Sequence, residues 1–205
     1  MPHTTWDTTT VVGEWKRTAE PADTPVSVAE LKGQSVYEET DPDQTVVLTR
    51  CIQATTNFVE QFLNRQLITA TYTLKFDSFR DPIVLPFPPL IAVEDDAIAY
   101  TDTSGASQTV TASLWEKDTQ SEPGLVLLSY NQSWPSDVRT SHNGITITYT
   151  AGYGTAQSSV PANIRHAILM GASDLFEHRE SQSEIRLQEN QAFMSLLWPY
   201  RIDFI

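Results

Sequence analysis

Apolar residues recur every three or four positions between Leu48 and Leu63, which places them in one stripe along a helix. Asp41 is a residue type preferred at a helix N-cap, Pro42 suits the first helical position, and Gln44 stands three residues after the cap. Together these signals predict a helix of about five turns that faces the core.

A shorter helix is predicted before it. Ser27 and Glu30 are spaced as a capping box, in which the hydroxyl and the carboxylate each satisfy a free N–H at a helix start. This helix should end near Gly33. A stiff linker at 21–25 precedes it, and the threonine-rich residues 1–20 are interpreted as an N-terminal arm with one weak edge-strand pattern.

From Ile68 onward the period of the pattern changes to two. Apolar residues from Ile68 to Phe76 alternate with three threonines and Lys75, which predicts a half-buried strand. Turn residues separate six further strand patterns: Ile83–Leu85, Leu90–Val93, Ala97–Tyr100, Gln108–Thr111, Leu125–Ser129 and Ile145–Thr150. Short strands of this kind predict a small antiparallel sheet or sandwich.

The helical period returns in the last quarter of the chain. One helix opens at Pro161, and a last helix is predicted from Glu184 to Trp198, where Pro199 ends it. The predicted fold class is therefore α+β. Its parts are a discontinuous helical bundle at 21–67 and 158–198, an inserted antiparallel β domain at 68–157, and a C-terminal docking tail at 199–205.

Composition narrows the function classes. A chain of 205 residues, 40% of them hydrophobic, can bury one core or two small ones. Its net charge of −13 opposes specific binding to nucleic acid, which depends on Lys and Arg. We expect no membrane partner, because no apolar run approaches the roughly 20 residues that span a bilayer. The single cysteine, Cys51, offers no intrachain disulfide or CxxC site.

Candidates for catalysis or metal binding are few. Asp174 and His178 lie four residues apart on a predicted helix and could supply two metal ligands. His166 would lie too far along the axis to join them, and the HExxH order is absent. The acidic run Glu94–Asp96 lacks the ligand spacing of a calcium loop. We interpret these residues as polar surface, and we expect no enzyme activity, metal or cofactor.

The C-terminal segment is unusually rich in large apolar side chains. Aromatic residues and arginine are typical of protein–protein interfaces. Alternate positions from Trp198 to Phe204 are apolar, as an extended strand docked on a partner requires, although a tail folded back on its own bundle is the alternative. The candidate partner-interface residues are Trp198, Tyr200, Arg201, Ile202, Phe204 and Ile205.

Several pieces of the sequence carry a family resemblance. In chain order they are Val26–Lys32, Phe58–Ile68, Ile83–Leu90, Ile147–Gly154, Val160–Leu169, Glu177–Glu180 and Leu196–Arg201. With them the chain resembles the head-tail connector (adaptor) proteins of long-tailed bacteriophages, in their larger form with a β insertion between the helices. The resemblance covers 21–201 and departs in the arm before Trp15 and after Arg201.

The resemblance implies a structural subunit of the virion neck, at the head-tail junction, that is present in the host cytoplasm during assembly. It implies a ring of about twelve copies on the portal protein, which extends the DNA channel and docks the next tail or stopper protein. Genomic DNA would pass through without specific binding, and acidic side chains facing the channel would keep it from sticking. The resemblance implies no catalytic residues.

Three alternatives stay open. The chain could be a tail-completion or stopper subunit of the same neck. It could instead be a ligand-binding β domain on a helical scaffold, with an aromatic site built from Trp115, Tyr130 or Trp134. A metal hydrolase built on Asp174 and His178 is the third.

Overall fold

The structure is a computed structural model that describes residues 13–34, 42–177 and 191–203. The chain divides into two compact units. The β unit takes in the described residues 13–20, 69–152 and 203, and the helical unit takes in residues 21–34, 42–68, 153–177 and 191–202. The predicted α+β class is confirmed, because segments on both sides of the β unit in the sequence supply the helices.

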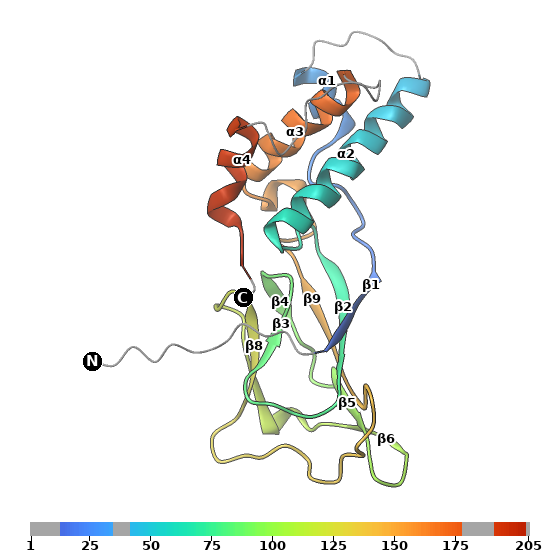
Figure 1. Cartoon of the computed structure of the whole chain (residues 1–205), viewed down its shortest axis with the longest axis vertical. Coiled ribbons are helices and arrows are strands. Elements are labelled where there is room, and N and C mark those ends of the chain that lie inside the picture. The colour runs from blue at the N-terminus through green and yellow to red at the C-terminus, as the bar shows by residue number, and fades with distance from the viewer. Residues whose placement is uncertain (1–12, 35–41, 178–190, 204–205) are drawn as a thin grey trace, which may run out of the picture. The chain divides into compact units, whose positions relative to one another are not determined.

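The described part of the helical unit is built from four α-helices and two short 3-10 helices (Figure 1). These elements are α1 (Val28–Gln34), α2 (Pro42–Leu63), η2 (Gln157–Ser159), α3 (Ala162–Glu177), α4 (Gln191–Leu197) and η4 (Trp198–Tyr200). Helix α3 packs against α1, α2 and α4. Residues 184–190 of the last predicted helix lie outside the described residues.

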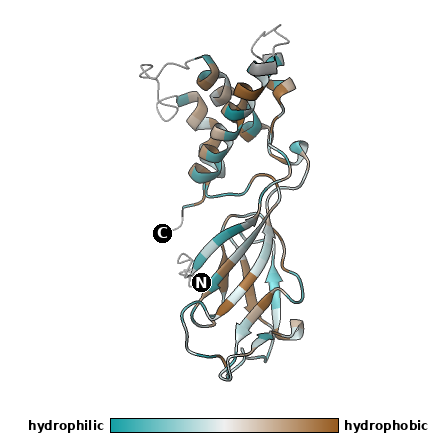
Figure 2. Ribbon diagram, turned by 90° about the vertical axis from the view of Figure 1, so that its right-hand side faces the viewer, coloured by the Kyte–Doolittle hydropathy of each residue, from teal (hydrophilic) through white to brown (hydrophobic). Residues whose placement is uncertain are grey.

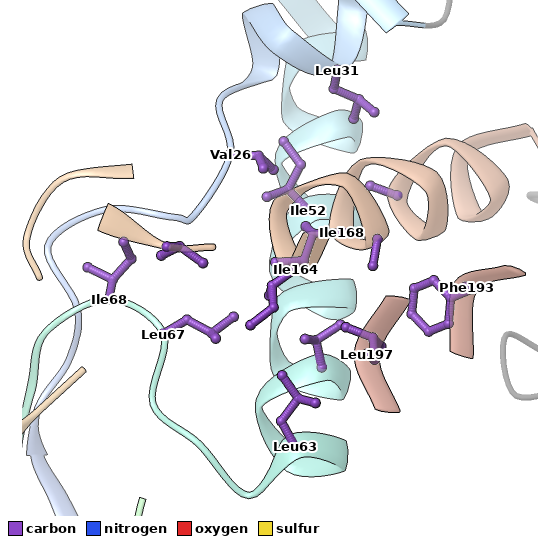
Figure 3. Packing of buried hydrophobic residues seen from close by; sticks show 14 of the residues in the cluster. Val26, Leu31, Ile52, Leu63, Leu67, Ile68, Ile164, Ile168, Phe193 and Leu197 are labelled. Carbon is purple, nitrogen blue, oxygen red and sulfur yellow. The ribbon is translucent and has the colours of Figure 1, made fainter. Parts of the chain in front are cut away.

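The apolar stripe predicted for α2 faces the core of this unit. Ile52 and Leu63 are at most 1% exposed and belong to one buried cluster with Ile164 of α3 and Phe193 of α4 (Figure 3). Burying each such side chain contributes about 2 kcal/mol. The packing of this stripe, rather than helix propensity, therefore holds α2 in place.

The capping box predicted at the start of α1 is confirmed. The Glu30 N–H donates to Ser27 Oγ at 3.1 Å, and the Ser27 N–H donates to Glu30 Oε2 at 2.8 Å. Glu30 also forms an ion pair with Arg165 of α3, whose Nε donates to the carbonyl oxygen of Pro25 at 3.2 Å. The cap of α1 is thus joined to a second helix.

Nine antiparallel strands form two sheets in the described part of the β unit. They are β1 (Glu14–Ala19), β2 (Ala70–Phe76), β3 (Ile83–Leu85), β4 (Leu90–Ala92), β5 (Ile98–Thr101), β6 (Ser107–Thr109), β7 (Trp115–Asp118), β8 (Gly124–Leu128) and β9 (Ile145–Ala151). The larger sheet has the order β1-β2-β9-β5-β6, with β4 also paired to β9, and the smaller has the order β3-β8-β7.

Strands β2 and β9 form the centre of the larger sheet. Tyr72 pairs with Tyr149 and Leu74 pairs with Ile147, and all four side chains are buried. The residues that alternate with them along each strand are mostly threonines on the opposite face, so buried positions alternate with half-buried or exposed ones, as the sequence predicts. Hydrophobic and hydrophilic residues are interspersed along the strands of the β unit (Figure 2).

Two strand predictions need correction. Strand β6 runs from Ser107 to Thr109 rather than from Gln108 to Thr111; the next residue, Val110, is buried and still donates its N–H to the carbonyl oxygen of Ile98 at 2.8 Å. Strand β7 was not predicted, since in Trp115–Asp118 only Trp115 is buried and no alternation of apolar residues marks the segment.

Candidate protein–protein interface

The C-terminal segment does not continue as an extended strand from Trp198. The N–H of Arg201 donates to the carbonyl oxygen of Trp198 at 3.2 Å and closes the 3-10 helix η4. The predicted extended conformation is therefore wrong for Trp198–Tyr200. Pro199 tolerates this turn because the first helical positions need no N–H donor. Phe204 and Ile205 lie outside the described residues.

Residues after η4 are hydrogen-bonded to the end of α2. The N–H of Ile202 donates to the carbonyl oxygen of Leu63 at 3.0 Å, and Asn64 Nδ2 donates to the carbonyl oxygen of Ile202 at 2.7 Å. Arg65 Nε donates to the carbonyl oxygen of Tyr200. Residues 200–202 therefore fold back on their own helical bundle, which is the alternative given above for the tail.

A left-handed residue at the end of α2 makes this contact possible. Asn64 has φ of 53°, a conformation that asparagine tolerates better than most residues. Its N–H donates to the carbonyl oxygen of Gln61 at 3.4 Å, and the N–H of Arg65 donates to that of Glu60 at 3.2 Å. This is a Schellman cap, and it turns the Asn64 and Arg65 side chains toward the tail.

The buried side chains of Glu60 and Gln66 stabilise the same turn. The Gln66 side chain is fully buried, and its Nε2 donates to Glu60 Oε1 at 2.7 Å and to the carbonyl oxygen of Ile68 at 2.9 Å. The N–H of Leu67 donates to the same Glu60 oxygen at 3.1 Å. Sequence reasoning missed this pair because Glu and Gln are usually exposed.

The exposed side of the segment carries an aromatic patch, defined here as Phe62, Trp198 and Arg201. The Arg201 guanidinium carbon lies 5.0 Å from the Phe62 ring centre and 5.5 Å from that of Trp198. Trp198 remains 61% exposed. A tryptophan and an arginine already held in place lose little side-chain entropy when a partner covers them. This patch contains two of the predicted interface residues, and their contact with a partner stays a prediction.

The metal-site candidates do not assemble in the described residues. Asp174 lies half-buried on α3 and His166 is exposed, whereas His178 falls outside the described residues. Glu94–Asp96 forms an exposed turn closed by a hydrogen bond from the Ala97 N–H to the carbonyl oxygen of Glu94, at 3.0 Å. Within the described ranges, no three His, Cys, Asp or Glu side chains gather as metal ligands.

The aromatic residues proposed for a ligand site do not converge. Trp115 is buried in the core of the β unit, and Tyr130 is 95% exposed. Trp134 stacks on Phe79 with ring centres 4.7 Å apart, and its Nε1 donates to the carbonyl oxygen of Arg80 at 3.0 Å. The structure therefore gives no site built from all three of these residues together.

One acidic group was not singled out from the sequence. The Asp102 carboxylate accepts hydrogen bonds from the Ser104 hydroxyl at 2.5 Å, Gln108 Nε2 at 2.8 Å and the Ala106 N–H at 2.9 Å. These bonds, led by that of Ser104, lower the pKa of Asp102 from 3.8 to about 2. With every partner inside one hairpin, its role is structural.

Comparison with known proteins gives one sequence relative. No family model matches the chain. The relative is the head completion protein gp6 of Enterobacteria phage HK97, which is 39% identical over 44 residues. The match covers 22% of this chain and spans 41% of the relative's length.

Solved structures give a match over nearly the whole chain. A chain in the neck of an empty gene transfer agent particle, computed with C6 symmetry, superposes with a TM-score of 0.75 at 20% identity. The match covers 94% of this chain and 97% of that one. A chain in a native particle neck computed with C12 symmetry gives a TM-score of 0.71 at 21% identity. The two proteins therefore share a fold. No helix in the described ranges is long and apolar enough to cross a membrane.

Proposed function

We propose that the protein is a structural subunit of the neck of a tailed phage or phage-like particle, an adaptor that forms a ring on the portal. The observation that carries the proposal is the superposition on a neck chain over 94% of this chain and 97% of the other. Both units are included in the match, so the whole architecture is shared and not only a common helical motif. The partial sequence match to a phage head completion protein supports the same role.

The symmetry of the matched particles favours a ring. Necks computed with C6 and C12 symmetry contain this fold. A ring closes when each copy presents two different, complementary surfaces to its neighbours. In such a ring of about twelve copies, a net charge of −13 per subunit would repel DNA moving through the channel. The protein would act in the virion neck, after assembly in the host cytoplasm.

We assign the partner contact to the C-terminal segment, with Trp198, Tyr200, Arg201, Ile202, Phe204 and Ile205 as its residues. The aromatic patch supports this assignment, because an exposed Trp198 held by Arg201 and Phe62 has the composition of an interface centre. The contact differs from the extended strand predicted from sequence. A rigid patch docks on the portal, and residues 200–202 remain bonded to α2.

Binding to the purified portal ring of the same particle tests the proposal. Sedimentation of the portal with excess protein should give one complex, heavier by about twelve subunits. A tail-completion or stopper subunit would leave the portal unbound and would bind only once another ring is present. If the protein binds neither the portal alone nor the portal that already carries another ring, a neck role is contradicted.

A further inference from the structure

The outer face of the smaller sheet carries an apolar row. In β8 the side chain of Val126 is fully buried, so Leu125 and Leu127 point to the opposite face, where both are half-buried. Val84 of β3 pairs with Leu125 and extends the row on that face. An antiparallel sheet with one solvated face normally carries polar residues there. This face is therefore more apolar than the solvent-facing side of a sheet usually is.

A shallow hollow of about 500 Å³ lies over this row. Pro82, Pro123, Leu125 and Leu127 supply its apolar lining, and its two charged lining residues, Asp81 and Glu122, are both carboxylates. The adjoining strand β7 adds two more acids, because Glu116 pairs with Leu127 and Asp118 pairs with Leu125. An apolar floor is thus edged by carboxylates on two sides.

Hydrogen bonds hold the acidic edge in place. Asp81 Oδ1 accepts from the N–H of Leu128 at 3.1 Å, which ties the segment before β3 to β8. Asp118 Oδ2 accepts from the Ser121 hydroxyl at 2.5 Å, and its Oδ1 accepts from the N–H of Gln120 at 2.8 Å. The turn that leads to Glu122 is therefore already ordered, so binding costs little conformational entropy there.

We propose that this hollow, lined by Pro82, Pro123, Leu125 and Leu127 and edged by Asp81, Glu116 and Glu122, binds a basic, apolar segment of a different protein of the particle. The inference rests on the proposed neck role and names the chemistry of the next partner. A second copy of this chain is the poorer occupant, because it brings a charge of −13 to an edge that is already acidic.

Site-specific photo-crosslinking in assembled particles tests this directly. A benzoylphenylalanine replaces Leu127, and the purified particles are irradiated before the crosslinked peptides are identified by mass spectrometry. The expected product joins the hollow to a segment of another particle protein that carries Lys or Arg beside apolar residues. A crosslink to a second copy, a crosslink to an acidic segment, or no crosslink would each overturn the proposal. If the variant does not fold, the same group at the exposed Glu116 gives the same readout.

Charge reversal supplies the functional test with a matched control. Glu116→Lys changes the edge of the hollow, whereas Asp95→Lys makes the same kind of charge reversal in an exposed turn of the larger sheet. We expect Glu116→Lys to reduce the yield of complete particles at least about threefold and Asp95→Lys to leave it near wild type. Equal yields from both variants would contradict the proposal.

Portal binding separates failure of this inference from failure of the proposed function. The Glu116→Lys variant should still sediment with the portal, because the hollow faces a different partner. If it binds the portal and assembles complete particles normally, the hollow is not a docking site and the neck role stands. If neither the wild type nor the variant binds the portal, the proposed function itself fails.

Discussion

Asn64 donates a hydrogen bond from its side-chain amide to the backbone carbonyl oxygen of Ile202, 2.7 Å away and 138 residues later in the sequence. The same residue ends α2 in the left-handed conformation. One asparagine therefore both terminates the longest helix of the described chain and fixes the course of the C-terminal segment beside the aromatic patch.

Separating these two roles gives the first prediction. Asn64→Gly keeps the left-handed conformation and loses only the bond to Ile202, so the free energy of unfolding should fall by about 1 kcal/mol. Asn64→Ala loses the same bond and puts alanine, which tolerates the left-handed conformation less well than asparagine or glycine, at this position, so the loss should reach about 2 kcal/mol. Urea denaturation of the two variants measures the difference. If the glycine variant is the less stable of the two, the cap has been misinterpreted.

The aromatic patch gives the second prediction. Trp198 is 61% exposed, so Trp198→Ala should change the free energy of unfolding by no more than about 1 kcal/mol. Affinity for the portal should fall at least about tenfold, because an exposed tryptophan at an interface centre contributes strongly to binding. Tyr130→Ala is the control, since Tyr130 is 95% exposed in the β unit. Equal portal affinity in the two variants would remove Trp198 from the interface.

Glu30 gives a prediction for pH. The hydrogen bond from the Ser27 N–H, followed by the charge of Arg165, lowers the pKa of Glu30 below its ordinary value of 4.5. A lowered carboxyl pKa stabilises the fold above the unfolded pKa, and that contribution disappears as the pH falls through the folded value. Wild type should therefore lose more stability than Glu30→Gln on going from pH 6 to pH 3. Thermal melts at both pH values test this, and identical losses would count against it.

Asp102 gives a corresponding prediction for the pH dependence of stability in the β unit, at lower pH. Its pKa is lowered from 3.8 to about 2, so its contribution to stability should be complete above pH 4 and should disappear as the pH falls toward 2. Asp102→Asn should be less stable than wild type at pH 7, with the difference shrinking below pH 3. Amide hydrogen exchange in Asp102–Thr109 is the measurement. A difference between the variants that stays constant with pH would show that the charge has no part.

Some of the fold could be predicted from local pattern. The stripe in α2, the capping box of α1 and the alternation in β2 depend on residues close together in the sequence, and each was recognisable. Strand β7 was not, because Trp115 is its one apolar residue; Lys117, two positions later, is exposed, and its Nζ donates to the carbonyl oxygen of Val93 at 2.8 Å. With one apolar residue in four, the segment lacks the alternation that marks a strand.

The conformation of the candidate interface could not be predicted from the local sequence either. Alternating apolar residues after Trp198 suggested an extended strand, but the segment instead meets Leu63, Asn64 and Arg65, whose positions depend on the end of a distant helix. The local sequence does not indicate long-range partners of this kind.

The Asp102 hairpin could have been recognised from the sequence, since a serine two positions after an aspartate and a following glycine are typical of a turn built on the carboxylate.

Cryo-electron microscopy of the purified protein bound to the portal of its own particle would show whether the protein is a ring-forming adaptor. We expect a closed ring of about twelve copies on the portal, with the aromatic patch of each copy against the portal surface. Portal rings that remain bare at saturating protein, or copies attached without forming a ring, would contradict it.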